Sequence, residues 1–206
     1  MSLMKREVKT ILFIILAVGV SLGFFIHQNY KADTRVYSAL PDLLTPAPSP
    51  IQTTSMDSPD GTKTLTMEKQ EIKDSARYSF FTSVKSENTK QTIFTKEVTS
   101  SQNLSIPYNA WSPDNVYIFL KEATPIENSY YVFFASGNNF SDNSQYLNIQ
   151  TIFTKKIPGY TILDVTGWAA PNLLIVNTKE IQGEKKVSFW FDVASQSFLQ
   201  LGTYFY

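Results

Sequence analysis

The chain of 206 residues contains no cysteine and a single histidine, and these two shortages exclude whole classes of chemistry. Without cysteine there are no disulfides, no thiolate nucleophiles and no cysteine metal sites. The histidine, His27, lies at the edge of an N-terminal apolar run, so the rest of the chain cannot form a Ser-His-Asp triad or a histidine-ligated metal site. We therefore expect no catalytic residue, no cofactor and no metal, and we predict that the protein is not an enzyme.

Glycine is also scarce, and neither sign of charge is in excess. Only eight glycines are present and none of them cluster, so no Gly-rich phosphate-binding loop can be found. A Gly-x-Ser-x-Gly nucleophile turn is missing as well. The chain carries 18 basic and 18 acidic residues, a balance that provides no basic face for a nucleic-acid partner.

One long apolar run is present, and it predicts a membrane anchor. Ile11–Ile26 contains sixteen residues without a charge, about 24 Å of helix against a hydrocarbon core of about 30 Å. Residues as far as Tyr30 extend it, so we predict a transmembrane signal-anchor helix at 11–30. A cleaved signal peptide is the alternative, but no Ala-x-Ala-like site follows the run.

The flanking charges predict how this anchor is oriented. Lys5, Arg6 and Lys9 precede the run, and the charges after it nearly balance. The positive-inside rule then places residues 1–10 in the cytoplasm and the rest of the chain outside the cell membrane. Residues 31–50 contain Pro41, Pro46, Pro48 and Pro50 and predict an extended stalk, with an ordinary surface loop as the alternative.

Internal repetition dominates the remainder, residues 51–206. Gln-Thr-Ile-Phe-Thr-Lys occurs at 91–96 and again at 150–155, which is 59 residues later. Ser-Pro-Asp-Gly at 58–61 recurs as Ser-Pro-Asp-Asn at 112–115 after 54 residues, and Trp111 recurs as Trp168 after 57. Three signals with similar spacings, 54 to 59 residues, predict repeated supersecondary units.

Each unit is expected to be a strand, a Pro-containing turn, a strand, a hairpin, a strand, a loop and an outer strand. The turn residues are Ser58, Pro59, Asp60 and Gly61 in unit one; Ser112, Pro113, Asp114 and Asn115, after Trp111, in unit two; and Pro171 and Asn172, after Trp168, in unit three. The predicted strands are about 64–72, 77–84, 91–98, 104–111, 116–122, 129–136, 146–155, 160–168, 173–178, 185–193 and 197–201, with a weak first strand at 51–56.

The Ser-Pro-Asp-Gly turn between the first two strands of a four-stranded unit resembles the WD40-like repeats of TolB-type β-propellers. The resemblance covers about residues 51–202, and it implies an all-β, extracytoplasmic, propeller-like domain. Complete propellers typically close with four to eight blades, and this chain has room for about three. We prefer a partial, propeller-like arc. Three arrangements stay open: an arc capped by the C-terminal aromatic residues 204–206, a ring completed by oligomerisation, or a different β-sandwich.

Two other groups of polar residues have both a chemical and a structural interpretation. Asp57 with Asp60, or Glu122 with Glu127, could form an acid/base pair, but turn preferences favour Asp60 and Asp114 as turn caps. The oxygen-rich loop at 137–144 lacks the spaced acidic residues of a calcium loop.

The aromatic runs at 117–119, 130–134 and 189–191 are expected to be buried on both faces, or to line a partner groove if the arc is open. The resulting hypothesis is a single-pass membrane protein whose β domain binds or assembles partners in the cell envelope, through a protein partner or self-association. The alternatives are a carboxylate-dependent, carbohydrate-active enzyme and a degenerate propeller fragment without independent function.

Overall fold

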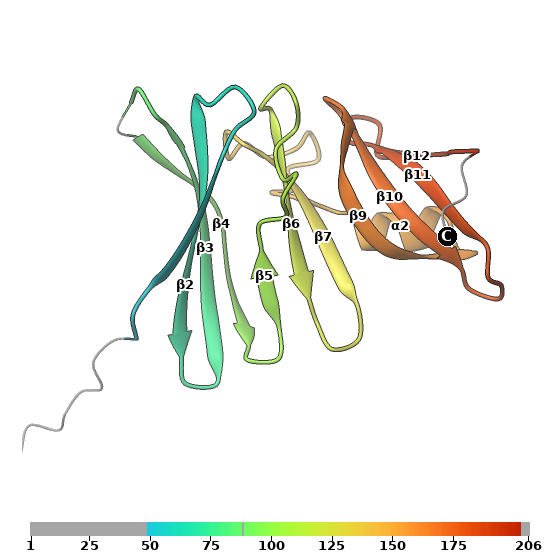
Figure 1. Cartoon of the computed structure of the whole chain (residues 1–206), viewed down its shortest axis with the longest axis horizontal. Helices are drawn as coiled ribbons and strands as arrows, with labels where there is room; N and C mark the ends of the chain where they lie inside the picture. Colours follow the sequence, from blue (N-terminus) through green and yellow to red (C-terminus); the bar gives the residue numbers. More distant parts are fainter. Residues whose placement is uncertain (1–48, 88, 203–206) are drawn as a thin grey trace, which may run out of the picture. The chain divides into compact units, whose positions relative to one another are not determined.

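Three four-stranded antiparallel sheets, none of them closed, make up the part of the chain that the computed structural model describes, residues 49–87 and 89–202 (Figure 1). The predicted cytoplasmic segment 1–10, the anchor 11–30 and nearly all of the stalk 31–50 lie outside the described residues, as do residues 203–206. Within the described ranges, no helix is long and apolar enough to cross a bilayer.

The strands follow one another within each sheet in the order of the chain, so each sheet is a simple meander. The first sheet contains β1 Gln52–Asp57, β2 Lys63–Ile72, β3 Ser75–Val84 and β4 Thr89–Thr99. The second contains β5 Asn103–Ser105, β6 Tyr117–Ala123, β7 Asn128–Phe134 and β8 Leu147–Asn148. The third contains β9 Tyr160–Ala170, β10 Leu173–Glu180, β11 Lys186–Asp192 and β12 Ser197–Gln200. This arrangement fits the partial propeller-like fold that the repeat predicts.

The hydrophobic core consists of two layers with the second sheet between them. Its strands have buried side chains on both faces: Ile118 and Phe133 belong to the layer shared with the first sheet. Phe119 and Val132, their neighbours in sequence, belong to the layer shared with the third sheet. Because successive residues of a strand point to opposite faces, the aromatic runs of β6 and β7 pack into both layers at once.

The second copy of the repeated hexapeptide is not the predicted strand. Residues 91–96 lie in β4, as expected, but 150–155 lie in a helix, α2 Ile149–Lys156. Asn148 starts this helix because its side chain accepts a hydrogen bond from the Thr151 backbone N–H at 3.0 Å. The strand before it, β8, has only two residues. The same six residues therefore form part of the last strand of unit one and a helix at the end of unit two.

The predicted strand at 104–111 is also shorter in the structure. β5 ends at Ser105, and pairing with β6 resumes only at Trp111, which bridges to Ile118. Pro107, which has no N–H to donate to the ladder, lies in the segment between them. The segment loops out of the sheet and carries Tyr108 into solvent, where its side chain is 90% exposed.

A matched pair of substitutions tests the two-layer core. Phe119 is fully buried, whereas Phe81 lies on the outward face of the first sheet beneath Lys90, whose Nζ is 3.7 Å from its ring centroid. We expect Phe119→Ala to lower the free energy of unfolding by about 3–5 kcal/mol and Phe81→Ala by about 1 kcal/mol or less. Urea denaturation of the full chain in mild detergent measures both, and equal losses would contradict the burial of the second sheet on both faces.

Candidate functional site

The two Ser-Pro-Asp turns share one hydrogen-bond network. In unit one, the Ser58 hydroxyl donates to Asp60 Oδ1 at 2.7 Å and accepts the Lys63 backbone N–H at 2.9 Å. Asp60 Oδ1 also accepts the Thr62 N–H at 3.0 Å. Unit two repeats these bonds: the Ser112 hydroxyl donates to Asp114 at 2.6 Å, the Tyr117 N–H donates to Ser112 at 2.9 Å, and the Val116 N–H donates to Asp114 at 3.2 Å. Each carboxylate therefore caps its own turn.

The fourth residue of each turn has a left-handed backbone. Gly61 has φ of 71° and Asn115 has φ of 59°. Glycine adopts this region at no steric cost and asparagine tolerates it better than most residues. The third unit has a different turn, in which the Asn172 side chain donates to Asp192 Oδ1 at 3.1 Å.

Each tryptophan of the repeat bonds to the unit before it. Trp111 Nε1 donates to the carbonyl oxygen of Met56 at 3.3 Å, and Trp168 Nε1 donates to that of Ala110 at 3.1 Å. Met56 and Ala110 are equivalent, since each lies two residues before the serine of its turn. We call these two bonds the tryptophan links. The sequence shows that the two tryptophans correspond, but their acceptors become visible only in the structure.

A shallow hollow of about 600 Å³ lies where the turns and the tryptophan links meet. Its lining residues come from all three units and include four of the predicted turn and tryptophan residues of the repeat and the candidate acid Asp57. They are Met56, Asp57, Pro59, Tyr108, Asn109, Trp111, Pro113 and Trp168. We call this the aromatic hollow. Tyr108 was not predicted as a site residue, because its exposure depends on the looped-out segment after β5.

A close backbone approach holds that looped-out segment against the third unit. Asn109 Nδ2 donates to the carbonyl oxygen of Thr166 at 3.2 Å. Next to it, Gly167 has φ of 143°, and a Cβ there would lie 2.8 Å from the Cβ of Asn109. Only glycine fits this contact, which fixes the position of the Tyr108 loop.

The aromatic hollow has one carboxylate, Asp57. Its side chain accepts hydrogen bonds from Lys85 Nζ at 2.7 Å and from Thr64 Oγ1 at 2.8 Å. These two bonds, the one from Lys85 first, lower the pKa of Asp57, so the group is ionised at neutral pH. The other candidate acid, Asp60, is committed to its own turn.

The two acids of the second candidate pair, Glu122 and Glu127, have different surroundings. Glu122 is buried between the first two sheets, where Lys96 Nζ donates to both of its oxygens at 2.9 and 2.7 Å and the Tyr131 hydroxyl donates to one of them. Burial, followed by this hydrogen bond, raises the pKa of Tyr131. Glu127 is exposed in the β6–β7 turn, so Glu122 has a structural role between the sheets.

The oxygen-rich loop uses its side chains within itself. Asn139 Nδ2 donates to Asn143 Oδ1 at 3.1 Å, and Asp142 Oδ1 accepts the Ser144 N–H at 3.0 Å. Among the described residues no group of three or more acidic, histidine or cysteine side chains is placed to hold a metal ion.

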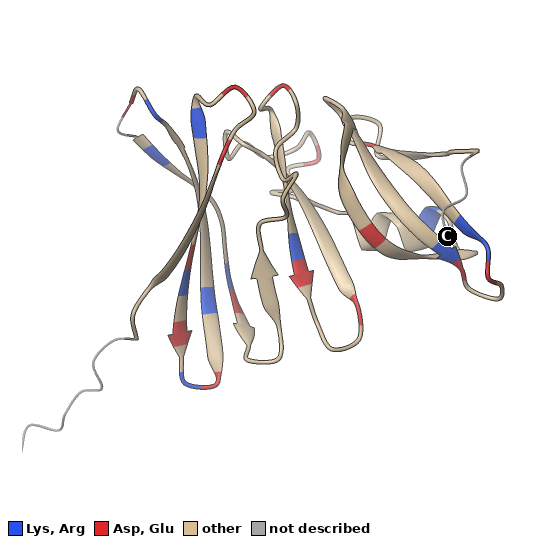
Figure 2. Ribbon diagram, viewed as in Figure 1, with Lys and Arg blue, Asp and Glu red and all other residues tan. Residues whose placement is uncertain are grey.

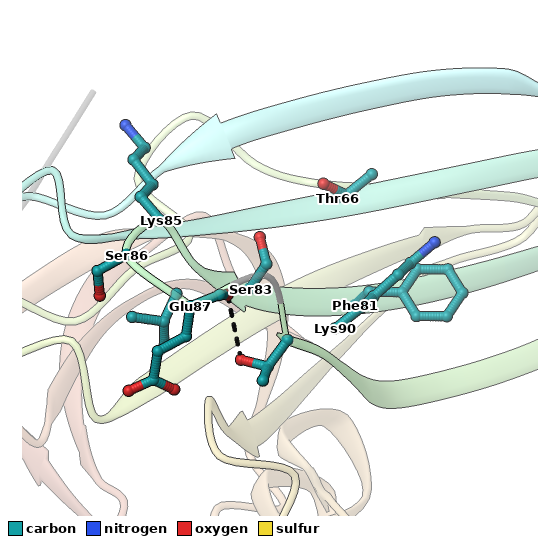
Figure 3. A pocket seen from close by; sticks show the side chains of 9 residues that line it. Thr66, Phe81, Ser83, Lys85, Ser86, Glu87 and Lys90 are labelled. Carbon is teal, nitrogen blue, oxygen red and sulfur yellow. Dashed lines mark hydrogen bonds between the residues drawn. The ribbon is translucent and has the colours of Figure 1, made fainter.

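A second hollow, of about 490 Å³, lies at the β3–β4 hairpin of the first sheet (Figure 3). Lys90 lies along the ring of Phe81, and its Nζ also pairs with Glu68 at 2.7 Å. Acidic and basic residues are interspersed over the described sheets, with no region of a single sign (Figure 2). The aromatic hollow is the better candidate, since it collects residues from three units.

No family model, no curated protein and no solved structure matches this chain.

The position shared by Gly61 and Asn115 provides a test of the repeated turn. Asn115 Oδ1 is buried without a protein hydrogen-bond partner among the described residues. We expect Asn115→Gly to change the free energy of unfolding by less than about 1 kcal/mol, since the loss of this orphaned oxygen offsets the added freedom of the unfolded chain.

Asn115→Ala is the matched control. It also removes the amide, but it places a Cβ without local hydrogen bonding at a positive φ, which costs about 1–3 kcal/mol. Urea denaturation of both variants measures the difference, and equal stability would contradict the left-handed turn.

Proposed function

We propose that this protein is a membrane-anchored extracytoplasmic binding module built from WD40-like, TolB-type repeats, and that it engages its partner at the aromatic hollow. The observation that carries the proposal is the placement of Tyr108. A tyrosine side chain that is 90% exposed lies on a loop held in place by Asn109 and Gly167, beside two tryptophans and two turn prolines. Rigid, exposed aromatic residues supply contact area at a low cost in entropy.

The repeat assignment has two supports besides the turn sequence. The hydrogen bonds of the Ser-Pro-Asp turn are repeated in units one and two, and the tryptophan links are repeated between units one and two and between units two and three. Each sheet is a meander of four strands, which is the strand order of a propeller blade.

The chemistry of the aromatic hollow favours binding over catalysis. Both indole N–H groups are committed to carbonyl oxygens, and Trp111 is buried, so the aromatic surface open to a partner is that of Tyr108 and part of Trp168. The single carboxylate, Asp57, is already paired with Lys85. A carbohydrate-active enzyme with two carboxylates needs a second acid facing the first across about 5–10 Å, and the described lining of the hollow has none.

Site-specific photocrosslinking tests this binding site. A benzophenone amino acid is placed at Tyr108 of the full chain in its own membrane, and at Ile126 as the control. Ile126 is 94% exposed and lies in the β6–β7 turn, at the other end of β6 from the hollow. We expect one discrete adduct from position 108, abolished by Trp168→Ala, and none from position 126. Identical adducts from both positions, or none, would contradict the proposal.

The anchor is tested separately, since it rests on residues 11–26 alone. We expect the chain to stay in the membrane pellet after extraction at alkaline pH and to be released when two central residues, Ile15 and Val18, are changed to Lys, because each charge at a helix centre costs about 2.5–3.5 kcal/mol. Protease added to the outside of intact cells should degrade 51–206. Full release of the unchanged chain at alkaline pH would rule out the anchor.

A further inference from the structure

The first strand of the described structure has one unpaired edge. β1 Gln52–Asp57 pairs with β2 and with no other described strand (Figure 1). Just beyond its end, the Ser58 N–H donates to the Lys63 carbonyl oxygen at 2.9 Å, so the backbones of these two residues face each other. Because backbone groups alternate in direction along a strand, Thr53 and Ser55 point their N–H and C=O groups away from β2. Those groups have no hydrogen-bond partner among the described residues.

The other edges of the three sheets carry features that discourage strand pairing. β5, β8 and β12 are edge strands of only three, two and four residues. β9 has three register irregularities along its pairing with β10. β4 is long, but it carries Lys90, Lys96 and Glu97. A loop also covers part of β4, since the Gln145 side chain donates to the Ile93 carbonyl oxygen at 2.9 Å. Short strands, bulges, charges and covering loops are the devices by which proteins keep a sheet edge from pairing with another chain.

β1 has none of these features. It has six residues, its register with β2 is continuous, and it contains no lysine or proline. Its one charge is the Asp57 carboxylate at the last position, which Lys85 already pairs with at 2.7 Å. Every side chain of the strand except that of Met56 is exposed. Among the described sheet edges, β1 is therefore the one without protection against strand pairing.

This open edge leads into the aromatic hollow. Met56 and Asp57, the last two residues of β1, line the hollow together with Tyr108 and Trp168. A row of alternating N–H and C=O groups is matched by another extended peptide backbone, whose own groups alternate with the same spacing. When a peptide adds to a sheet edge in this way, its backbone supplies affinity and its alternate side chains enter neighbouring pockets.

We propose that an extended segment of a partner protein adds to β1 as a further strand of the first sheet and places a side chain in the aromatic hollow. The inference rests on the proposed function, because it states how the partner at the hollow is held. A second copy of this chain, pairing through its own β1, is a poorer occupant. Such a pair would join two six-residue strands by their edges alone, and this covers only part of each residue. A stable dimer buries about 800 Å² on each partner.

Photocrosslinking along β1 tests the strand pairing directly. A benzophenone amino acid is placed at Thr53 and, in a second variant, at Ser55 of the full chain in its own membrane, and the adducts are mapped by peptide mass spectrometry. The two side chains lie on one face of β1, so a paired strand meets them with residues that are themselves two apart. We expect both probes to label one partner segment, at positions two residues apart.

Proline substitution tests the open backbone groups. Ser55→Pro removes an N–H from the open edge and leaves the bonds to β2 in place. Thr95→Pro is the matched control on β4, where the same alternation points the N–H out of the sheet. Each variant also loses one cross-strand hydroxyl bond, Ser55 with Thr66 at 3.2 Å and Thr95 with Ser79 at 3.4 Å. We expect Ser55→Pro to reduce the adduct from position 108 about tenfold, the effect of roughly one lost hydrogen bond, and Thr95→Pro to leave it unchanged.

Four outcomes would overturn the inference. An adduct from position 108 that survives Ser55→Pro, with none from positions 53 and 55, would show a partner at the hollow without strand pairing, and the proposed function would stand. Labels on residues 52–57 of a linked dimer would show that a second copy occupies the edge. Labels scattered over several segments, without the two-residue spacing, would show contact without register. No adduct from any of the three positions would contradict both the inference and the proposed function. Circular dichroism checks that the proline variants fold, and if Ser55→Pro does not, the spacing of the labels decides alone.

Discussion

The second sheet has buried apolar side chains on both of its faces, and the rest of the described structure depends on that constraint. Phe119, Tyr130 and Val132 pack toward the third sheet, while Ile118, Leu120 and Phe133 pack toward the first. A four-stranded sheet with apolar side chains on both faces is stable only when other elements cover both of them. The three units therefore form a single folded body, and the polar residues between the sheets must find partners within it, as Glu122 does with Lys96 and Tyr131.

The tryptophan links fix how each unit meets the one before it. Apolar packing between sheets is not directional, so it permits neighbouring units to slide. A hydrogen bond from an indole to one particular carbonyl oxygen, made at equivalent positions in two successive units, removes that freedom. The same bonds bring the turn prolines and the Tyr108 loop together at one end of the sheets. The aromatic hollow is thus a consequence of the repeat, and it is the feature on which the proposed binding function rests.

Much of this fold could be predicted from the sequence, because its signals are local. The Ser-Pro-Asp turns form their hydrogen bonds within six residues, and the hairpins of the first sheet follow from alternating side chains such as Ala76, Tyr78 and Phe80. The second copy of the hexapeptide could not be predicted, since an identical segment becomes a helix only where Asn148 caps it and β8 is short. Tyr108 was missed because contacts 57 residues apart, such as Asn109 with Thr166, place it.

The most direct test of this account is the hydrogen exchange of the three indole N–H groups, followed by NMR in the full chain and assigned with single Trp→Phe variants. If the tryptophan links join the units, the indole protons of Trp111 and Trp168 exchange at least tenfold more slowly in the folded chain than in urea, which corresponds to about 1.4 kcal/mol or more of protection. Exchange of either proton at the rate of the unfolded chain would contradict the account, because the unit it joins would then lack the bond that fixes its position.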